Sequence, residues 1–423
     1  MKGSDEERFR AGLAKLERAR MSRFELLKRG GITALVLGGA PALLAACGGD
    51  DEEEAAAPPP PADTGGAAAE PAAPPPAPEP AVPAASGTLD FLSWEGYDFP
   101  VDSMTAWKEA NGVEVKSTYI GSHDDIQAKI AGGGGEGVDL ITYYQGYKAL
   151  YRELGILSPL DPEKLPNLGN LFPFFGSDSG NWWVEPDGSR TGVPMFWGAL
   201  GITYDSAVVT TPPDTYDILF EPEFKGKVTL ADDPVGGYTL AGHILGLDVS
   251  KMTEDDFQKI TDWLKELIKQ TKGVAPSYGD ATSRLVSGDA TISFLGWAAM
   301  NSFAKDAGKD TVLTVLPKEG GYSFCDAYAI PPTSDNVDTA HAMVNQGVDP
   351  QVNAEAAIYL VGGTTCTPSV DLLTPDIAAL YDYANIDTWF ERAPLYGNPP
   401  IESDEFVTVD KVIAAWQELK ATA

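Results

Sequence analysis

The sequence predicts an α/β fold with largely parallel sheets that begins at about residue 88. Hydrophobic residues make up 43% and aromatic residues 10% of the 423-residue chain, which is enough for a packed core and excludes wholesale disorder. Short apolar strand patterns alternate with helical patterns along the chain, as they do in α/β proteins. At about 150 residues per domain, the length indicates two or three lobes.

Strands and helices alternate in the first part of this pattern. The alternation of apolar residues over 89–94 indicates the first strand. Ser122 can cap a helix whose first turn holds Asp124 and Asp125, where the helix dipole favours acidic residues. In chain order, the expected elements are strand 89–94, helix 101–110, strand 113–120, helix 124–130, strand 138–142 and helix 148–154.

A long extended segment opens the second part. Residues 191–204 contain several glycines and no helical period, which favours an extended conformation. A helix over 257–269 has its apolar residues on one face. Further strands are expected over 228–233, 291–297 and 311–316.

Residues 1–46 have the composition of an export signal. Nine Lys or Arg and five Asp or Glu lie in residues 1–30, and an apolar run follows over 32–46. Gly38, Gly39 and Pro41 interrupt that run, which is also short for a membrane-spanning helix.

The end of this signal and its basic part each resemble a known motif. Leu44-Ala-Ala-Cys47 resembles the bacterial lipobox, which implies cleavage before Cys47 and attachment of a diacylglyceryl group to its sulfur. Residues 22–28 resemble a twin-arginine motif in which Phe24 replaces the second arginine, so export in the folded or the unfolded state stays open. Met1 and Met21 are both compatible starts of translation.

Residues 47–87 are predicted to be a disordered, acidic, Ala/Pro-rich tether. Between residues 48 and 86 there are eight acidic residues and no Lys or Arg. Such a segment buries too little apolar surface to offset the entropy of ordering it, and proline extends it. The tether would hold a folded body away from a membrane surface.

The net charge of the chain limits its partners. With 30 Lys and Arg against 62 Asp and Glu, the formal charge is −32. This charge argues against nucleic acid as a partner and favours a cationic one. Three His and three Cys argue against a multi-His zinc site or a cysteine cluster, so no metal or cofactor is expected.

Several segments resemble the spermidine/putrescine-binding family, the substrate-binding proteins of ATP-driven importers. The resemblance runs from Leu89 to the C-terminus with few gaps. The matching segments are Ser93-Trp-Glu-Gly-Tyr97, Val138-Asp-Leu-Ile141 with the tyrosines that follow it, Val193-Pro-Met-Phe-Trp-Gly198, residues 222–227, Leu230-Ala-Asp-Asp233 and residues 316–331.

The resemblance implies a type II periplasmic-binding-protein fold, in which two lobes joined by hinge segments close on a ligand in the cleft between them. One lobe would comprise residues 88–197 and about 327–372, and the other residues 198–326 and about 373–423. The crossings would fall near 198–203, near 322–326 and after Thr367. The protein would be an exported monomer, anchored by lipid on the outer face of the cytoplasmic membrane and acting with the permease subunits of an ABC importer.

The resemblance also implies a polyamine ligand and the residues that bind it. A polyamine needs aromatic faces for its methylenes and charge, and carboxylates for its ammonium groups. Asp326 is expected to be the principal carboxylate. Asp233 matches a family acid, but an ordinary turn before Pro234 explains it equally well. The expected ligand-binding residues are Trp94, Tyr97, Tyr144, Tyr147, Asp233, Trp297, Phe324 and Asp326.

Two departures from the family pattern bear on which cation is bound. Gly236 stands where relatives carry a second acidic residue, and Phe324 replaces a tryptophan. The first leaves room for putrescine or a shorter amine rather than spermidine. Cys325 and Cys366 both fall beside the implied cleft, and an oxidising compartment makes them candidates for a disulfide.

Other functions remain as alternatives. The same fold could bind ferric ion through Tyr143 and Tyr144, or a basic or other small organic cation. A secreted hydrolase would need opposed carboxylates or a nucleophile elbow. Neither pattern stands out in the sequence, so no catalytic residue is assigned.

Overall fold

The computed structural model describes residues 84–120, 123–130, 137–176 and 182–422. The predicted export signal, Cys47 and most of the tether lie outside these residues, as does the predicted helix cap Ser122. In the described ranges, no helix combines the length and the apolar character needed to cross a membrane.

The strands form one eight-stranded sheet with the order β2-β1-β3-β8-β4-β6-β5, and β7 pairs with the far end of β4. Every predicted strand is present within a few residues of its expected ends. The strands are β1 (Gly87–Ser93), β2 (Val113–Tyr119), β3 (Leu140–Tyr144), β4 (Val193–Asp205), β5 (Val228–Leu230), β6 (Ile292–Trp297), β7 (Val312–Val315) and β8 (Tyr322–Ala329).

The sheet is mixed, so the prediction of largely parallel sheets is wrong. Strand β1 runs parallel to β2 and β3, and β5 runs parallel to β6. The pairs β3–β8, β4–β8, β4–β6 and β4–β7 are antiparallel. Alternating strand and helix patterns indicate parallel strands only where a helix returns the chain to the same edge, and β4 and β8 instead run in opposite directions through the centre of the sheet.

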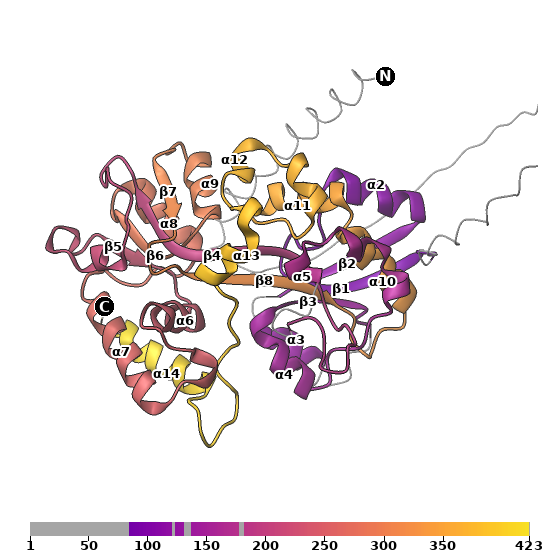
Figure 1. Ribbon diagram of the computed structural model, residues 1–423, viewed down its shortest axis with the longest axis horizontal. Coiled ribbons are helices and arrows are strands. Elements are labelled where there is room, and N and C mark those ends of the chain that lie inside the picture. Colours follow the sequence, from indigo (N-terminus) through magenta and orange to yellow (C-terminus); the bar gives the residue numbers. More distant parts are fainter. Residues whose placement is uncertain (1–83, 121–122, 131–136, 177–181, 423) are drawn as a thin grey trace, which may run out of the picture.

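Helices cover this sheet in both halves of an elongated body (Figure 1). Capping residues define several of them; Thr253, for example, makes a reciprocal capping box with Asp256 at the start of α7. The helices are α2 (Asp102–Asn111), α3 (His123–Ile130), α4 (Lys148–Glu153), α5 (Pro173–Gly176), α6 (Pro234–Ile244), α7 (Glu254–Ile268), α8 (Tyr278–Ser287), α9 (Ala299–Asp306), α10 (Val337–Gly347), α11 (Pro350–Leu360), α12 (Pro375–Ala378), α13 (Ile386–Arg392) and α14 (Val409–Lys420).

Two large hydrophobic clusters form the core, one in each half of the body. The first cluster joins β1, β3 and α10, with Phe91 and Tyr328 among its fully buried members. The second cluster joins β5, β6, α6, α7 and α14, and includes Leu264 and Trp416. Two separate cores joined through one sheet are the physical basis for two lobes.

Strands β4 and β8 contribute to both clusters and lie side by side along the body (Figure 1). On β4, Trp197 belongs to the first cluster and Leu200 to the second. On β8, Tyr322 belongs to the second cluster and Cys325 to the first. The chain therefore passes between the two cores within these few residues of each strand.

The chain also passes between the two cores nearer its C-terminus. Tyr381, Phe390 and Leu395 pack in the first cluster, whereas Val407 packs in the second. Residues 381–395, which the family resemblance places in the second lobe, thus contact the first core. This packing favours a lobe boundary after Leu395, and the lobe boundaries themselves stay predictions.

The folded body begins slightly before its predicted start. Ala85 is buried in a small cluster with Val113 and Ala342. The backbone N–H of Ser86 donates to Oγ1 of Thr339, and that hydroxyl donates to the carbonyl of Ser86. Residues 85–87 therefore belong to the body rather than to the tether, because contacts with distant parts of the chain hold a segment whose composition alone indicates disorder.

The expected disulfide is absent: Cys325 and Cys366 are free, buried thiols. Sγ of Cys325 lies 3.8 Å from the carbonyl oxygen of Asp326, and Sγ of Cys366 lies 3.4 Å from the carbonyl oxygen of Val348. Each sulfur is thus held at its own place in the first cluster, and proximity to the cleft does not bring the two together.

We expect iodoacetamide to alkylate both cysteines when the protein is denatured without reductant, because neither sulfur is cross-linked. Peptide mass spectrometry reads the modification at Cys325 and Cys366 separately. Recovery of a peptide pair linked through these two residues would contradict the structure.

Candidate ligand-binding site

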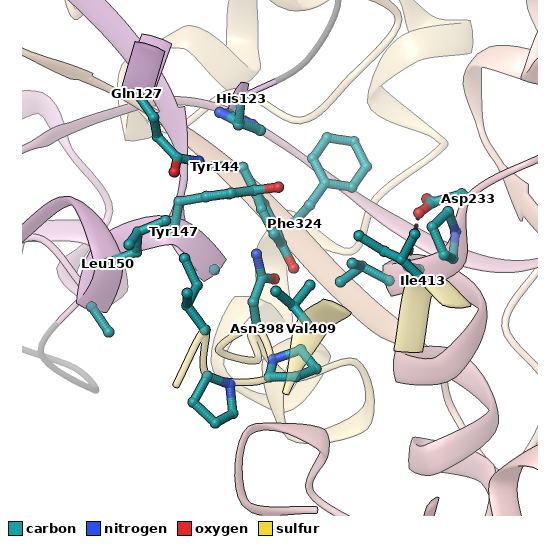
Figure 2. A pocket seen from close by; sticks show the side chains of 18 of the residues that line it. His123, Gln127, Tyr144, Tyr147, Leu150, Asp233, Phe324, Asn398, Val409 and Ile413 are labelled. Atoms are coloured by element: carbon teal, nitrogen blue, oxygen red, sulfur yellow. Dashed lines mark hydrogen bonds between the residues drawn. The ribbon is translucent and has the colours of Figure 1, made fainter. Parts of the chain in front are cut away.

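A pocket of about 890 Å³ opens between the two halves of the body, on the side where α3 and α4 face α6 and α14. Its walls come from the loop after β1, from α3, from the turn that joins β3 to α4, from the start of α6, from β6 and β8, and from residues 398–413. Figure 2 shows Tyr144 and Tyr147 on one side of this pocket and Asp233 on the other, with Phe324 between them.

All eight residues that the sequence predicts for ligand binding line this pocket. They come from five separate segments of the chain, and the fold brings them together. The residues are Trp94, Tyr97, Tyr144, Tyr147, Asp233, Trp297, Phe324 and Asp326. The structure contains no ligand, so their role in binding stays a prediction.

Strand β8 supplies the central carboxylate. Because successive side chains of a strand point to opposite faces, Tyr322, Phe324 and Asp326 share one face and all line the pocket. Asp326 is only 4% exposed, and the hydroxyl of Tyr97 donates to its Oδ2 at 2.9 Å. Burial raises the pKa of Asp326 to about 7, while the hydrogen bond from Tyr97 acts in the opposite direction. A carboxylate so deprived of water is strongly stabilised by any cation that reaches it.

Asp233 supplies a second carboxylate from the opposite wall, at the residue that immediately precedes α6. It is the N-cap of α6, where its Oδ1 accepts from the backbone N–H of Gly236 at 2.8 Å. Its Oδ2 accepts from the hydroxyl of Tyr278 at 2.9 Å. Burial raises the pKa of this carboxyl as well. One oxygen therefore caps the helix, and the residue also lines the pocket.

Aromatic rings form most of the remaining wall. The ring of Phe324 meets the edge of Trp297 at 5.5 Å between centroids. Tyr144 is the last residue of β3 and Tyr147 lies on the short turn that follows, with ring centroids 6.2 Å apart. Glycine at 146 permits this turn, because a Cβ there would collide with Asn398 and with the ring of Tyr144. Such faces suit methylene groups and cations.

The charge of the lining is entirely negative at neutral pH. Among the described residues that line the pocket, none is Lys or Arg. Burial lowers the pKa of His123, which also lines the pocket, to about 3, so this side chain is neutral. The acidic lining residues are Glu153, Asp233, Asp326, Glu402 and Asp410. The arrangement therefore favours a cation with apolar parts.

Four of the other lining residues, none of them predicted from the sequence, add polar or aromatic groups to the site. His123 stacks on Tyr147 at 4.1 Å between centroids, and Tyr278 binds Asp233. Asn398 lines the pocket with a buried side-chain oxygen that has no partner among the described residues. Tyr322 could have been found, because it alternates with Phe324 and Asp326 within the matching segment 316–331. The other three depend on contacts between distant segments.

The structure gives no support to a metal site at the tyrosine pair. Tyr143 is fully buried, and its hydroxyl donates to the carbonyl of Trp182, whereas Tyr144 lines the pocket. The alternation of β3 thus directs the two phenols to opposite faces. Among the described residues, no three His, Cys, Asp or Glu side chains are grouped as metal ligands.

Comparisons with known proteins agree with this architecture. The model of the family described as bacterial extracellular solute-binding protein matches residues 102–385. The putrescine-binding periplasmic protein PotF of Escherichia coli K12 is 26% identical over 323 residues, which cover 72% of this chain and 85% of PotF. The spermidine/putrescine-binding periplasmic protein of the same organism is 25% identical over 337 residues, covering 79% and 92% of the two chains.

A solved structure has the same fold. The substrate-binding protein PotD of a spermidine/putrescine ABC transporter from Streptococcus pneumoniae superposes with a TM-score of 0.64. It is 22% identical and covers 79% of this chain and 98% of its own. The two-lobed α/β fold of periplasmic binding proteins is thereby confirmed. With the family match spanning most of the chain, the protein belongs to the bacterial extracellular solute-binding proteins.

Proposed function

We propose that this protein is the substrate-binding component of an ABC-type importer and that it delivers a putrescine- or spermidine-like polyamine to a membrane permease. The observation that carries the proposal is Asp326, a nearly buried carboxylate in an aromatic pocket whose described lining has no Lys or Arg. Relatives of this chain are named for the same class of ligand.

Each part of a polyamine would have its own partner in the pocket. Asp326 would bind one ammonium group, and Asp233 on the opposite wall a second one. The rings of Trp94, Trp297 and Phe324 would cover the methylenes between them. Cation–π contacts are worth about 0.5–2 kcal/mol each and hydrogen bonds to charged groups about 1.5–3 kcal/mol. Three or four such contacts supply part of the roughly −8 kcal/mol that micromolar affinity requires, and burial of the methylenes adds to them.

The rest of the chain would present this pocket outside the cytoplasmic membrane. The export signal would be removed before Cys47, whose lipid would anchor a monomer to the outer face of the membrane. The two lobes would comprise residues 88–197 with about 327–372, and residues 198–326 with about 373–423. The packing of residues 381–395 favours moving the last of these boundaries to a position after Leu395. Closure of the lobes on the ligand would create the surface that the permease subunits recognise. This is a binding role without catalysis.

Other small organic cations are the alternative that the pocket favours most. Its volume of about 890 Å³ exceeds what a linear diamine needs, and its acidic rim residues Glu153, Glu402 and Asp410 would attract any cation. Ferric ion is disfavoured because Tyr143 does not reach the pocket.

Calorimetric titration of the purified full-length protein tests the proposal. We expect putrescine or spermidine to bind with micromolar or tighter affinity, and lysine and arginine to bind more weakly, because their carboxylate would face an acidic pocket. Ferric citrate should give no binding heat. Binding of ferric citrate alone would overturn the assignment of an amine ligand.

A further inference from the structure

The hydroxyl of Tyr322 lies at the Asp233 end of the pocket without a hydrogen-bond partner among the described residues. Its ring packs in the second cluster and the residue is 4% exposed, yet it lines the pocket. A phenol hydroxyl that borders the pocket and makes no hydrogen bond to the described residues can donate to or accept from a ligand.

The hydroxyl of Tyr322 shares a small space with Asp233, and Gly236 keeps that space open. A Cβ at position 236 would collide with Oδ2 of Asp233 and would lie 2.9 Å from the hydroxyl oxygen of Tyr322. The carboxylate oxygen and the phenol therefore both border the position that a side chain at 236 would occupy. The absence of a side chain there leaves these two groups facing the pocket.

The chemistry of these groups matches a primary ammonium. Oδ2 of Asp233 already accepts from Tyr278, and it retains lone-pair capacity for a ligand N–H. Burial, and then the nearby charge of Asp233, raise the pKa of Tyr322, so the phenol keeps its proton and offers its oxygen as an acceptor. A primary ammonium has three N–H groups to satisfy, whereas an N-acylated amine has one N–H and no charge.

We infer that Tyr322 is a specificity-determining residue whose hydroxyl, together with the carboxylate of Asp233, binds a primary ammonium group at this end of the pocket. The inference rests on the proposed amine-binding function and adds a preference for cations that present a free primary amine at each end. In this chain the phenol of Tyr322 would take the place of the second acidic residue that relatives carry at the position of Gly236.

Titration of the full-length Tyr322→Phe variant with three amines tests this inference. Butane-1,4-diamine has two primary ammonium groups, whereas N-acetylputrescine and butylamine have one, which Asp326 would bind. We expect the affinity for the diamine to fall about tenfold, as the loss of a hydrogen bond to a charged group predicts. The affinities for the two monocations should change by less than about twofold. The ratio of diamine affinity to monocation affinity should therefore fall.

A matched control is Tyr204→Phe, which removes a hydroxyl from the second cluster at a residue outside the pocket lining. It should bind all three amines as the unmodified protein does. A second variant, Gly236→Ala, should weaken diamine binding selectively because its methyl group collides with Asp233. This variant carries the test if Tyr322→Phe does not fold.

The outcomes separate this inference from the proposed function. If the unmodified protein binds no amine, the proposed function fails and the inference fails with it. If the unmodified protein binds the diamine and Tyr322→Phe binds it equally well, the inference alone is overturned. Equal weakening for all three amines would also overturn it, since that result indicates a structural role.

Discussion

Replacing Asp326 by Asn should weaken polyamine binding at least about tenfold, as measured by titration calorimetry at pH 8. The substitution keeps the shape of the side chain and an oxygen that can accept from Tyr97, but it removes the charge that would neutralise a buried ammonium. A hydrogen bond to a charged group is worth about 1.5–3 kcal/mol, which corresponds to about ten- to a hundredfold in affinity.

Two controls separate lost binding from lost folding. Burial raises the pKa of Asp326 from an unfolded value of about 3.9 to about 7. Its ionised form therefore destabilises the ligand-free fold above pH 7, and the neutral Asn variant should melt at the same or a higher temperature at pH 8.

Asp232→Asn removes one charge next to Asp233 at a residue that contacts Trp416 and Lys420 and does not line the pocket. That control should bind within about twofold of the unmodified protein. Unchanged affinity in Asp326→Asn would refute the assigned role of this carboxylate.

Amine affinity should fall steeply as the pH drops below 7. The pKa of Asp326 is raised to about 7 by burial, so below that pH a proton competes with the ammonium for the carboxylate. The ligand amines stay protonated throughout, since ordinary amine pKa values lie near 10.4. Between pH 8 and pH 5 the ionised fraction of such a group falls about a hundredfold, and the dissociation constant should rise by a similar factor.

The other groups that face the pocket sharpen this test. His123 stays neutral across the range because burial lowers its pKa to about 3. Asp233 has a raised pKa as well, so its protonation adds to the loss at the acidic end. Calorimetry from pH 5 to pH 8 should give a much flatter profile for Asp326→Asn than for the unmodified protein. Parallel profiles would assign the pH dependence to another group.

The sequence predicts the strands and the site better than it predicts how they connect. Local alternation in residues 322–326 is sufficient to place Phe324 and Asp326 on one face, and the structure has that face lining the pocket. The direction of β8 is not a local property, because it is set by pairing with β3 and β4. A pattern of alternating strands and helices therefore predicted parallel strands where the sheet is mixed.

The residues that were missed are those whose positions depend on distant segments. Asn398 reaches the pocket because its backbone N–H donates to the carbonyl of Gly146, some 250 positions earlier in the chain. The pKa of His123 falls to about 3 because the fold buries it among rings such as that of Tyr147. The sequence left open whether Cys325 and Cys366 are bonded for the same reason, since nearness to the cleft does not determine the separation of two sulfur atoms.

The place of Asp326 on β8 has a mechanical consequence. This strand contributes residues to both cores. A cation bound to Asp326 would therefore act on a segment that connects the two lobes rather than on one lobe alone. A molecule bound only by Asp233 would contact one lobe and would not affect the position of the other. Ligands whose charge reaches Asp326 on β8 would thus differ from ligands bound only at Asp233 in their effect on lobe closure.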